Sequence, residues 1–194
     1  MKIIGITGGI GSGKSTFCKL VELLGYPVYY ADERGRWLTN NTLKTPIISL
    51  LGAASFQDGQ LNRSWVAKQV FSDKSLLQKL NAIIHPAVAE DFKNWMKAAG
   101  KELVFYEAAL IYENGSQDRF DQVVLVTAPE EIRVSRVLQR DKHRTEQDIK
   151  KIIANQLAEE EKISLADHVV ENDGQHSMIA QAVALIDRLV VAEQ

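Results

Sequence analysis

The sequence predicts an α/β fold: a doubly wound, five-stranded parallel sheet with a helical insertion and a short lid. Two observations predict it. Short apolar runs alternate with helical stretches along the chain, and buried parallel strands have that appearance between helices. A glycine-rich octapeptide at residues 8–15 (GGIGSGKS) separates the first apolar run from the first helical pattern. Because no low-complexity tract, repeat or long linker interrupts the alternation, we expect one domain over residues 1–194.

The apolar runs give the expected strands in order. They are Lys2–Thr7, Pro27–Ala31, Glu102–Glu107, Gln122–Thr127 and His168–Glu171. The clearest helices are expected at Pro129–Arg140, Glu146–Glu161 and Ser177–Ala192. Helical spacing in the last of these predicts one buried apolar stripe, formed by Ile179, Ala182, Val183, Ile186, Leu189 and Val190.

The octapeptide carries the first functional signal. It fits G-x-x-x-x-G-K-[ST], the phosphate-binding loop motif of P-loop NTPases, and it follows a strand and precedes a helix that Gly25 is placed to end. This order aims backbone N–H groups and a helix N-terminus at phosphate oxygens. Lys14 would then reach the β- and γ-phosphates, and the Ser15 hydroxyl would bind Mg²⁺. The motif predicts a protein that binds a nucleoside triphosphate; the alternative is a glycine-rich turn that happens to precede a helix.

The interval from 34 to 97 differs from its flanks. It is mostly helical, has no strong strand and contains Trp37, Trp65 and Trp95, which we interpret as core residues. A helical insertion beside the carboxyl edge of the sheet is a place where an acceptor substrate could bind. We therefore expect a core at 1–33 and 98–194, an acceptor-binding insertion at 34–97 and a lid at 139–148.

Composition excludes several classes of function. Charged residues make up 25% of the chain and the formal net charge is −2, so no surface for long nucleic acid is expected. The single cysteine, Cys18, excludes an internal disulfide and a multi-cysteine zinc site, and we expect it to be buried. No apolar run approaches the roughly 20 residues that span a membrane. Glycines interrupt the first apolar stretch, which argues against a signal sequence and predicts a cytoplasmic protein.

Carboxylates follow two of the expected strands. Asp32 comes just after the second strand, where it could accept a hydroxyl proton or help to hold Mg²⁺; position alone leaves a helix N-cap equally open. Glu107 ends the third strand, where an acidic group often serves the metal, and Glu113 follows shortly after. A solvated loop carboxylate is the ordinary alternative for both glutamates.

Basic residues gather after the fourth strand. Arginines and lysines recur through 133–144, and the run ends in a short polar loop between two helices. Such a run is commonly a solvated helix face. It is also typical of a lid whose arginines close over transferring phosphates. In the insertion, Arg63 and the His85-Pro86 pair also stand out, although His-Pro is often only a helix terminus.

Together these motifs resemble the dephospho-coenzyme A kinase family along nearly the whole chain. The resemblance rests on residues 6–16, on Ala31-Asp32 with Arg36, and on Leu61-Asn62-Arg63. It continues through Ile84-His85-Pro86, Leu110-Ile111-Tyr112-Glu113, Gln139-Arg140 with Gln156, and residues 166–172 (ADHVVEN). It implies transfer of the γ-phosphoryl group of ATP, with Mg²⁺, to the ribose 3′-hydroxyl of dephospho-coenzyme A.

The resemblance also implies roles for individual residues. Asp32 becomes the favoured catalytic base, assisted by Lys14, with Ser15 on the metal. ATP contacts are implied at Gly9, Gly11, Ser12, Gly13, Lys14, Ser15, Thr16, Arg140 and Asn172. Contacts to the acceptor are implied at Asp32, Arg36, Arg63, His85 and Glu113.

The chain departs from the family pattern at two strand ends. Tyr30 stands where the second strand commonly has the first aspartate of Asp-Ala-Asp, and residues 107–111 read EAALI where Asp-x-Pro-Leu-Leu is common. The retained carboxylates, Asp32 and Glu107, can still act. Two alternatives remain: a related nucleoside or nucleotide kinase of the same fold, and a non-catalytic nucleotide switch. No Asn-Lys-x-Asp guanine-reading segment supports the latter.

Overall fold

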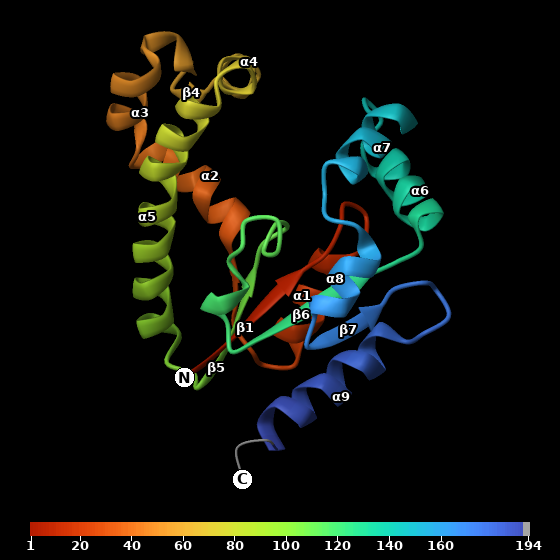
Figure 1. Cartoon of the computed structure of the whole chain (residues 1–194). Coiled ribbons are helices and arrows are strands. Elements are labelled where there is room, and N and C mark those ends of the chain that lie inside the picture. The colour runs from red at the N-terminus through yellow and green to blue at the C-terminus, as the bar shows by residue number, and fades with distance from the viewer. Residues whose placement is uncertain (192–194) are drawn as a thin grey trace. The chain divides into compact units, whose positions relative to one another are not determined.

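The structure is a computed structural model that describes residues 1–191. The chain folds into two compact units. One unit joins Met1–Tyr29 to the chain from Lys101 onward, and the other is Tyr30–Gly100 (Figure 1). The first unit contains the central sheet. The second is mostly helical, as expected for the interval between the second and third strands.

A five-stranded sheet forms the centre of the first unit. Its strands are β1 (Lys2–Thr7), β2 (Val28–Tyr30), β5 (Leu103–Glu107), β6 (Gln122–Thr127) and β7 (His168–Glu171). They lie in the order β2-β5-β1-β6-β7, and the ladders of β1 with β5, β1 with β6, and β6 with β7 are parallel. The five-stranded parallel sheet is thereby confirmed. Because parallel strands end at one edge, the loops after β1, β5, β6 and β7 meet there.

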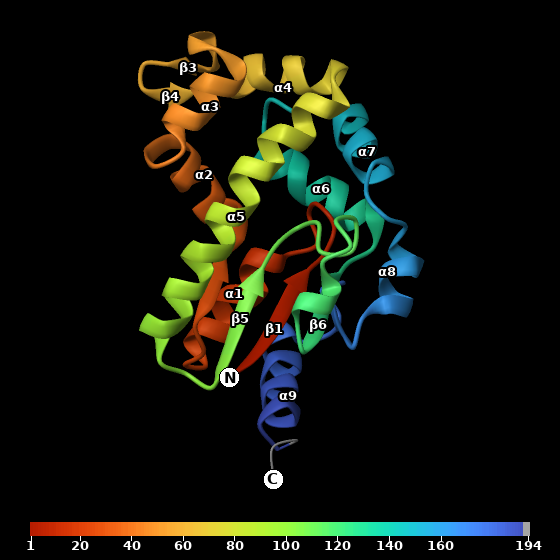
Figure 2. The same cartoon turned by 60° about the vertical axis from the view of Figure 1, so that its left-hand side comes forward.

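Helices cover the sheet and explain why the middle residues of its central strands are apolar. Ile4, Val104 and Val124 are fully buried, which is typical of strands enclosed on both faces. Helix α1 (Lys14–Leu23) contacts β1 and α9 (Met178–Val191), whereas α8 (Glu159–Leu165) contacts β6. Figure 1 shows α8 in front of β6 and α1 behind the sheet, and in the turned view of Figure 2 α1 and α8 lie on opposite sides of β1.

The end of α1 and the buried face of α9 can be compared with those expected from the sequence. Helix α1 ends as predicted, because Gly25 has φ +91° and its N–H bonds the Glu22 carbonyl. The stripe expected on α9 is partly wrong. Its buried residues are Ala182, Leu185, Ile186 and Leu189, whereas Ile179, Val183 and Val190 are exposed. The buried face is thus rotated toward Leu185. The expected end at Ala192 lies outside the described residues.

The helix expected over Glu146–Glu161 is two helices. Helix α7 (Glu146–Ala154) starts at a Thr145–Asp148 capping box, and α8 begins only at Glu159. Between them, the Ile10 N–H bonds the Gln156 side chain and the Leu157 N–H bonds Glu113. These long-range bonds replace the intrahelical pattern, so tertiary structure overrides the local helical spacing. The preceding helix, α6 (Glu130–Arg140), has its expected extent, with Pro129 at its N-cap.

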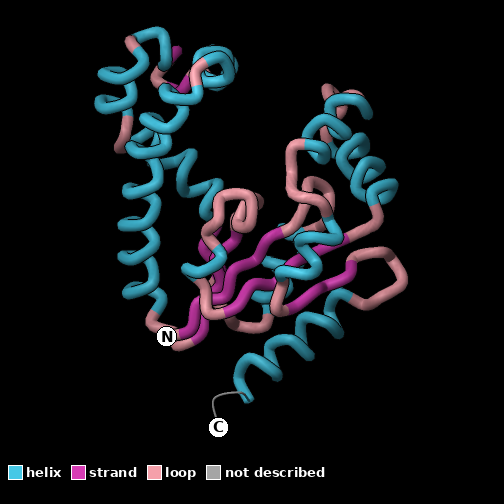
Figure 3. The backbone as a smooth tube through the Cα atoms, viewed as in Figure 1, coloured by secondary structure: helices cyan, strands magenta, loops and turns pink. Residues whose placement is uncertain are grey.

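The second unit contains four helices in its described residues, with a small hairpin among them (Figure 3). They are α2 (Ala31–Asn41), α3 (Lys44–Leu51), α4 (Arg63–Ser72) and α5 (Lys74–Ala99). The hairpin pairs β3 (Phe56–Gln57) with β4 (Gln60–Leu61), and short 3₁₀ turns occur at Ala53–Ser55 here and at Gln117–Arg119 in the first unit. A cluster of Ile47, Val66 and Leu80 forms its core.

For this unit, one alternative is ruled out and one expectation is wrong. Pro86 lies inside the 26-residue helix α5, so His85-Pro86 does not mark a helix end. Instead, Asp73 caps the start of α5 and Gly100 ends it in the left-handed conformation. Trp37 is 50% exposed and is not a core residue, although Trp65 packs on the core cluster and Trp95 stacks on Phe92. None of the described helices has the length and apolar character needed to cross a membrane.

Candidate active site

The loop between β1 and α1 has the conformation that the octapeptide motif requires. At Gly13, φ is +99° and a Cβ would collide with the Asn172 side-chain amide. At Gly11, φ is +78° and a Cβ would collide with the Arg133 carbonyl oxygen. Glycine is therefore needed at both positions, for backbone conformation and for space. We call residues Gly8–Ser15 the phosphate loop.

Lys14 and Ser15 open the helix that follows the phosphate loop. Gly13 is the N-cap of α1, and its carbonyl accepts the N–H groups of Thr16 and Phe17. The Lys14 ammonium donates to the Gly8 carbonyl at 2.8 Å, across the mouth of the loop. Ser15 and Thr16 are exposed. The loop thus presents a lysine, two hydroxyls and a helix N-terminus at one place, the set that binds an anionic phosphate chain.

Arg136 and Asn172 brace the phosphate loop from the side. The Asn172 side chain donates to the Ser12 carbonyl at 2.8 Å. Arg136, in α6, donates to both the backbone and the side-chain oxygen of Asn172, at 3.0 and 3.2 Å. Its buried Nη1 has no partner within the described chain. Three segments far apart in the sequence therefore meet at the loop.

Buried charges join α6 to α8 beside the phosphate loop. Glu159 lies 3.5 Å from Arg133 and 3.0 Å from Lys162, and it accepts a 2.6 Å hydrogen bond from the Thr127 hydroxyl. Arg133 is 4% exposed and Lys162 is 1% exposed. Because burial of an isolated ion is costly, the two cations depend on this carboxylate.

Glu159→Gln should therefore destabilise the protein by about 3 kcal/mol, because two buried cations would lose their counter-charge while the hydrogen bond from Thr127 is retained. Chemical denaturation would measure the free energy of unfolding. Glu160→Gln, at the exposed neighbour, is the matched control and should change it little. Equal stability of the two variants would contradict the dependence on Glu159.

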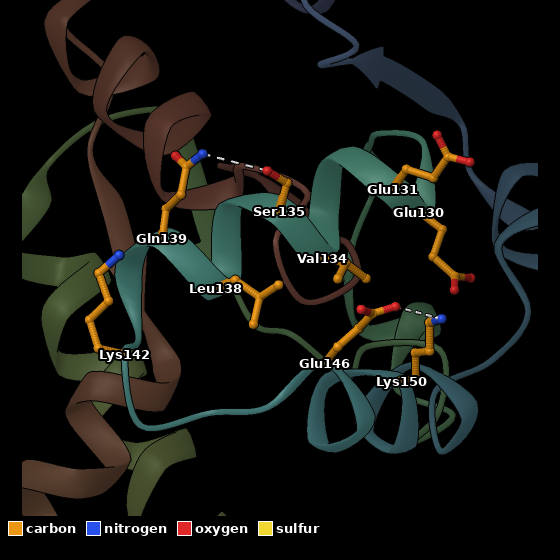
Figure 4. A pocket seen from close by; sticks show the side chains of 9 residues that line it. All are labelled: Glu130, Glu131, Val134, Ser135, Leu138, Gln139, Lys142, Glu146 and Lys150. Atoms are coloured by element: carbon orange, nitrogen blue, oxygen red, sulfur yellow. Dashed lines mark hydrogen bonds and ion pairs between the residues drawn. The ribbon is translucent and has the colours of Figure 1, made fainter.

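A cavity of about 530 Å³ adjoins this network in the first unit. Thr127, Arg133, Gln156 and Glu159 are among its lining residues. A second cavity, of about 680 Å³, lies between α6 and α7 and includes Gln139 and Lys142 (Figure 4). The expected lid, 139–148, thus joins two helices with a hollow between them. Arg140 is exposed at the end of α6.

Glu113 holds the segment between α7 and α8. Its Oε1 accepts the Leu157 N–H at 3.1 Å, whereas its buried Oε2 has no partner within the described chain. The neighbouring Gln156 accepts the Ile10 N–H of the phosphate loop at 3.1 Å. The structure therefore shows Glu113 bracing the segment that contacts the loop; its expected contact to the acceptor stays a prediction.

Glu107 lies at the carboxyl end of β5 beside β1. It is 8% exposed, and its register partner is Ile6. The Glu107 charge contributes to the raised pKa of Cys18, whose main cause is burial, while Lys14 acts in the opposite direction. Cys18 is fully buried, which confirms that expectation, and its thiol stays protonated and unreactive.

The remaining candidates lie in the second unit. Asp32 is exposed in the first turn of α2, whose N-cap is Tyr30, so Asp32 is not the cap residue. Arg36 is exposed one turn later on the same helix face. Arg63 begins α4, and His85 is exposed on α5. The Arg34–Asp91 ion pair ties α2 to α5 within this unit.

Sequence reasoning missed Arg136 and Glu159 as individual site residues. Arg136 was one of many basic residues in the 133–144 run. Spacing along one helix does not show which of them is turned toward the phosphate loop. Glu159 is the first of three consecutive glutamates, and only the fold distinguishes the one that contacts buried cations.

A charged cluster follows β7. The His176 imidazole lies 2.9 Å from Asp173 and 3.2 Å from Glu171. These carboxylates raise the pKa of His176, with the hydrogen bond to Asp173 as the largest cause. Backbone N–H groups of His176 and Gln175 lower the pKa of Asp173 to about 2.

Asp173→Asn should bring the pKa of His176 back toward its ordinary value of about 6.5, as followed by NMR titration of the imidazole. Because the folded-state pKa is raised, the stabilisation from charged His176 is complete below about pH 6.5 and is lost as pH rises through the folded pKa. His168 is the internal control, since burial lowers its pKa instead. An unchanged His176 titration would contradict the assignment to Asp173.

One protein family matches nearly the whole chain. The family model described as dephospho-CoA kinase matches residues 2–177. A dephospho-CoA kinase of Bacteroides fragilis is 38% identical over 188 residues, covering 94% of this chain and 90% of its own. A dephospho-CoA kinase of Porphyromonas gingivalis is 35% identical, covering 96% and 94%.

Solved structures, kinases among them, are similar to this fold. A crystal structure from Thermus thermophilus superposes with a TM-score of 0.88 at 35% identity, covering 99% of this chain and 97% of its own. A dephospho-CoA kinase from Campylobacter jejuni has a TM-score of 0.69 at 25% identity and full coverage of both chains. A shikimate kinase from Acinetobacter baumannii, at 18% identity and a TM-score of 0.57, supports the kinase fold alone.

Proposed function

The chain belongs to the dephospho-CoA kinase family, and from that premise we propose that it transfers the γ-phosphoryl group of ATP to the ribose 3′-hydroxyl of dephospho-coenzyme A. ATP-dependent phosphorylation of dephospho-coenzyme A is the activity of the family to which residues 2–177 match. The observation that carries the proposal is this match, which covers the phosphate loop, the helical second unit and the loop after β7.

The proposed reaction needs positioning more than covalent chemistry. A bond forms between the ribose oxygen and the γ-phosphorus, and the bond from that phosphorus to the β–γ bridging oxygen breaks. Such transfers proceed with the attacking and leaving oxygens in line and with charge spread over the phosphoryl oxygens. We assign Asp32 as the group that orients the hydroxyl and takes its proton, and Lys14 as the group that neutralises the developing charge.

The remaining candidate residues divide between the two substrates. Assigned to the ATP side are Gly9, Gly11, Ser12, Gly13, Lys14, Ser15, Thr16, Arg140 and Asn172. Assigned to the acceptor are Asp32, Arg36, Arg63, His85 and Glu113. The division proposed for the chain is a core at 1–33 and 98–194, an acceptor-binding insertion at 34–97 and a lid at 139–148. A biosynthetic kinase of this family is expected to act in the cytoplasm.

The residues present fit a magnesium ion. Magnesium prefers hard oxygen ligands and usually retains waters beside one or two carboxylates and the substrate phosphates. The exposed Ser15 hydroxyl, in the first turn of α1, and the buried Glu107 carboxylate, at the carboxyl end of β5, are such donors. Ser15 would hold the ion, with Glu107 as the nearby acidic group. When bound, the ion supplies charge neutralisation at the β- and γ-phosphates.

The test is ADP release from Mg-ATP by the purified protein, with and without dephospho-coenzyme A, together with mass detection and mapping of the product. We expect acceptor-dependent ADP and a product one phosphoryl group heavier, modified at the 3′ position. ATP binding without that product would overturn the substrate assignment. A panel of nucleosides and nucleotides would then identify a related kinase, and guanine against adenine competition would identify a switch.

A further inference from the structure

The peptide between Ser12 and Gly13 is held by a residue 160 positions away. The Asn172 side-chain amide donates to the Ser12 carbonyl at 2.8 Å. Asn172 lies immediately after β7, and its amide fills the space that a Cβ on Gly13 would occupy. A carbonyl in the phosphate loop therefore has a fixed partner on the protein side.

Each polar group of Asn172 has a hydrogen-bond partner within the protein. Its backbone N–H donates to the Thr127 carbonyl at 2.8 Å, which continues the β6–β7 pairing. Arg136 contacts its backbone oxygen at 3.0 Å and its side-chain oxygen at 3.2 Å. One residue earlier, the Gln181 side chain bonds both the N–H and the carbonyl of Glu171, at 2.9 and 2.8 Å. The Asn172 side chain is therefore fixed in orientation before any nucleotide arrives.

Peptide geometry makes this bond significant. A trans peptide is planar, so its carbonyl and its N–H point to opposite sides. The hydrogen bond from Asn172 holds the Ser12 carbonyl on the Asn172 side, and the Gly13 N–H consequently points away from it. Gly13, at φ +99°, has the freedom to accept a flipped peptide at little cost. A flip would turn a carbonyl oxygen toward an anionic ligand in place of an N–H donor.

We propose that Asn172, oriented by Arg136, is a positioning residue that keeps the Gly13 N–H aimed at the phosphates, and that it does not read the adenine base. The inference rests on the proposed nucleotide site, because it assigns the Gly13 N–H to a bound phosphate chain. It separates two roles for Asn172 that sequence resemblance does not distinguish. A base contact affects one nucleotide, whereas a positioned peptide affects every ligand with the same phosphates.

The test uses Asn172→Asp, which is nearly isosteric and keeps an acceptor for Arg136 but has no donor for the Ser12 carbonyl. Binding of Mg-ATP, Mg-GTP and magnesium tripolyphosphate is measured by calorimetry without acceptor. We expect each of the three to weaken by a similar factor, about tenfold or more. Asn114→Asp, at an exposed asparagine of the same unit, adds the same charge and should leave all three affinities unchanged.

Wild-type affinities of Asn172→Asp for all three ligands would overturn the proposal. Loss of ATP binding with tripolyphosphate binding retained would also overturn it, because that result would identify a contact to the base. Arg136→Lys is a second variant in case the first does not fold: it keeps the positive charge but lacks the planar guanidinium. We expect a smaller loss, again independent of the base, and a shifted NMR resonance of the Gly13 amide. An unmoved Gly13 resonance would also overturn the proposal. Because no acceptor is present, failure of the substrate assignment would leave these results interpretable.

Discussion

Asp32→Asn should lower kcat for phosphorylation of dephospho-coenzyme A by about 10²–10⁴-fold, the range expected when a general base is removed. Asparagine keeps the size and the hydrogen-bonding oxygen of the side chain but cannot take the hydroxyl proton. Affinity for ATP should change little, since the phosphate loop is unaltered. Steady-state kinetics with both substrates, combined with calorimetric ATP binding, would measure the two effects separately.

Folding is not expected to limit this test. Asp32 is exposed in the first turn of α2, where the N-cap is Tyr30. Loss of one acidic group there should cost only the few tenths of a kcal/mol typical of a helix-dipole interaction. Glu33→Gln, at the adjacent exposed acid of the same turn, is the matched control and should retain normal turnover. Near-normal kcat in Asp32→Asn would remove Asp32 from the role of base.

Lys14→Met should lower kcat by about 10³-fold and should also weaken Mg-ATP binding, because the charge that faces the β- and γ-phosphates would be lost. Methionine retains most of the side-chain length. It also removes the bond from the Lys14 ammonium to the Gly8 carbonyl, so the conformation of the phosphate loop changes with the charge. Turnover and calorimetric binding would be measured on the same preparation.

Two comparisons separate these contributions. Lys14→Arg retains the charge, and a partial recovery of affinity would assign the binding loss to electrostatics. Lys19→Met, at an exposed lysine of the same helix, controls for the change in net charge and should leave both parameters unaltered. Wild-type turnover in Lys14→Met would refute the assignment of residues Gly8–Ser15 as the catalytic phosphate loop.

The local elements were well predicted because their signals are local. The strand over Lys2–Thr7 and the helix ending before Gly25 depend on apolar periodicity and on glycine conformations that neighbouring residues determine. The prediction of one continuous helix over 146–161 was wrong because its signal is not local. Its break depends on Glu113 and on the N–H of Ile10, which are distant in the sequence.

By itself, the sequence determined the parallel α/β sheet, the phosphate-loop motif at residues 8–15 and the resemblance of nearly the whole chain to one kinase family. These conclusions follow from contiguous motifs and from their order. Only the tertiary structure decided which basic residue of 133–144 contacts Asn172, which of three glutamates balances Arg133 and Lys162, and how Asn172 holds the Ser12 carbonyl. These pairs join residues from separate segments of the chain. Local sequence constrains the identity of each partner but not the distance between them.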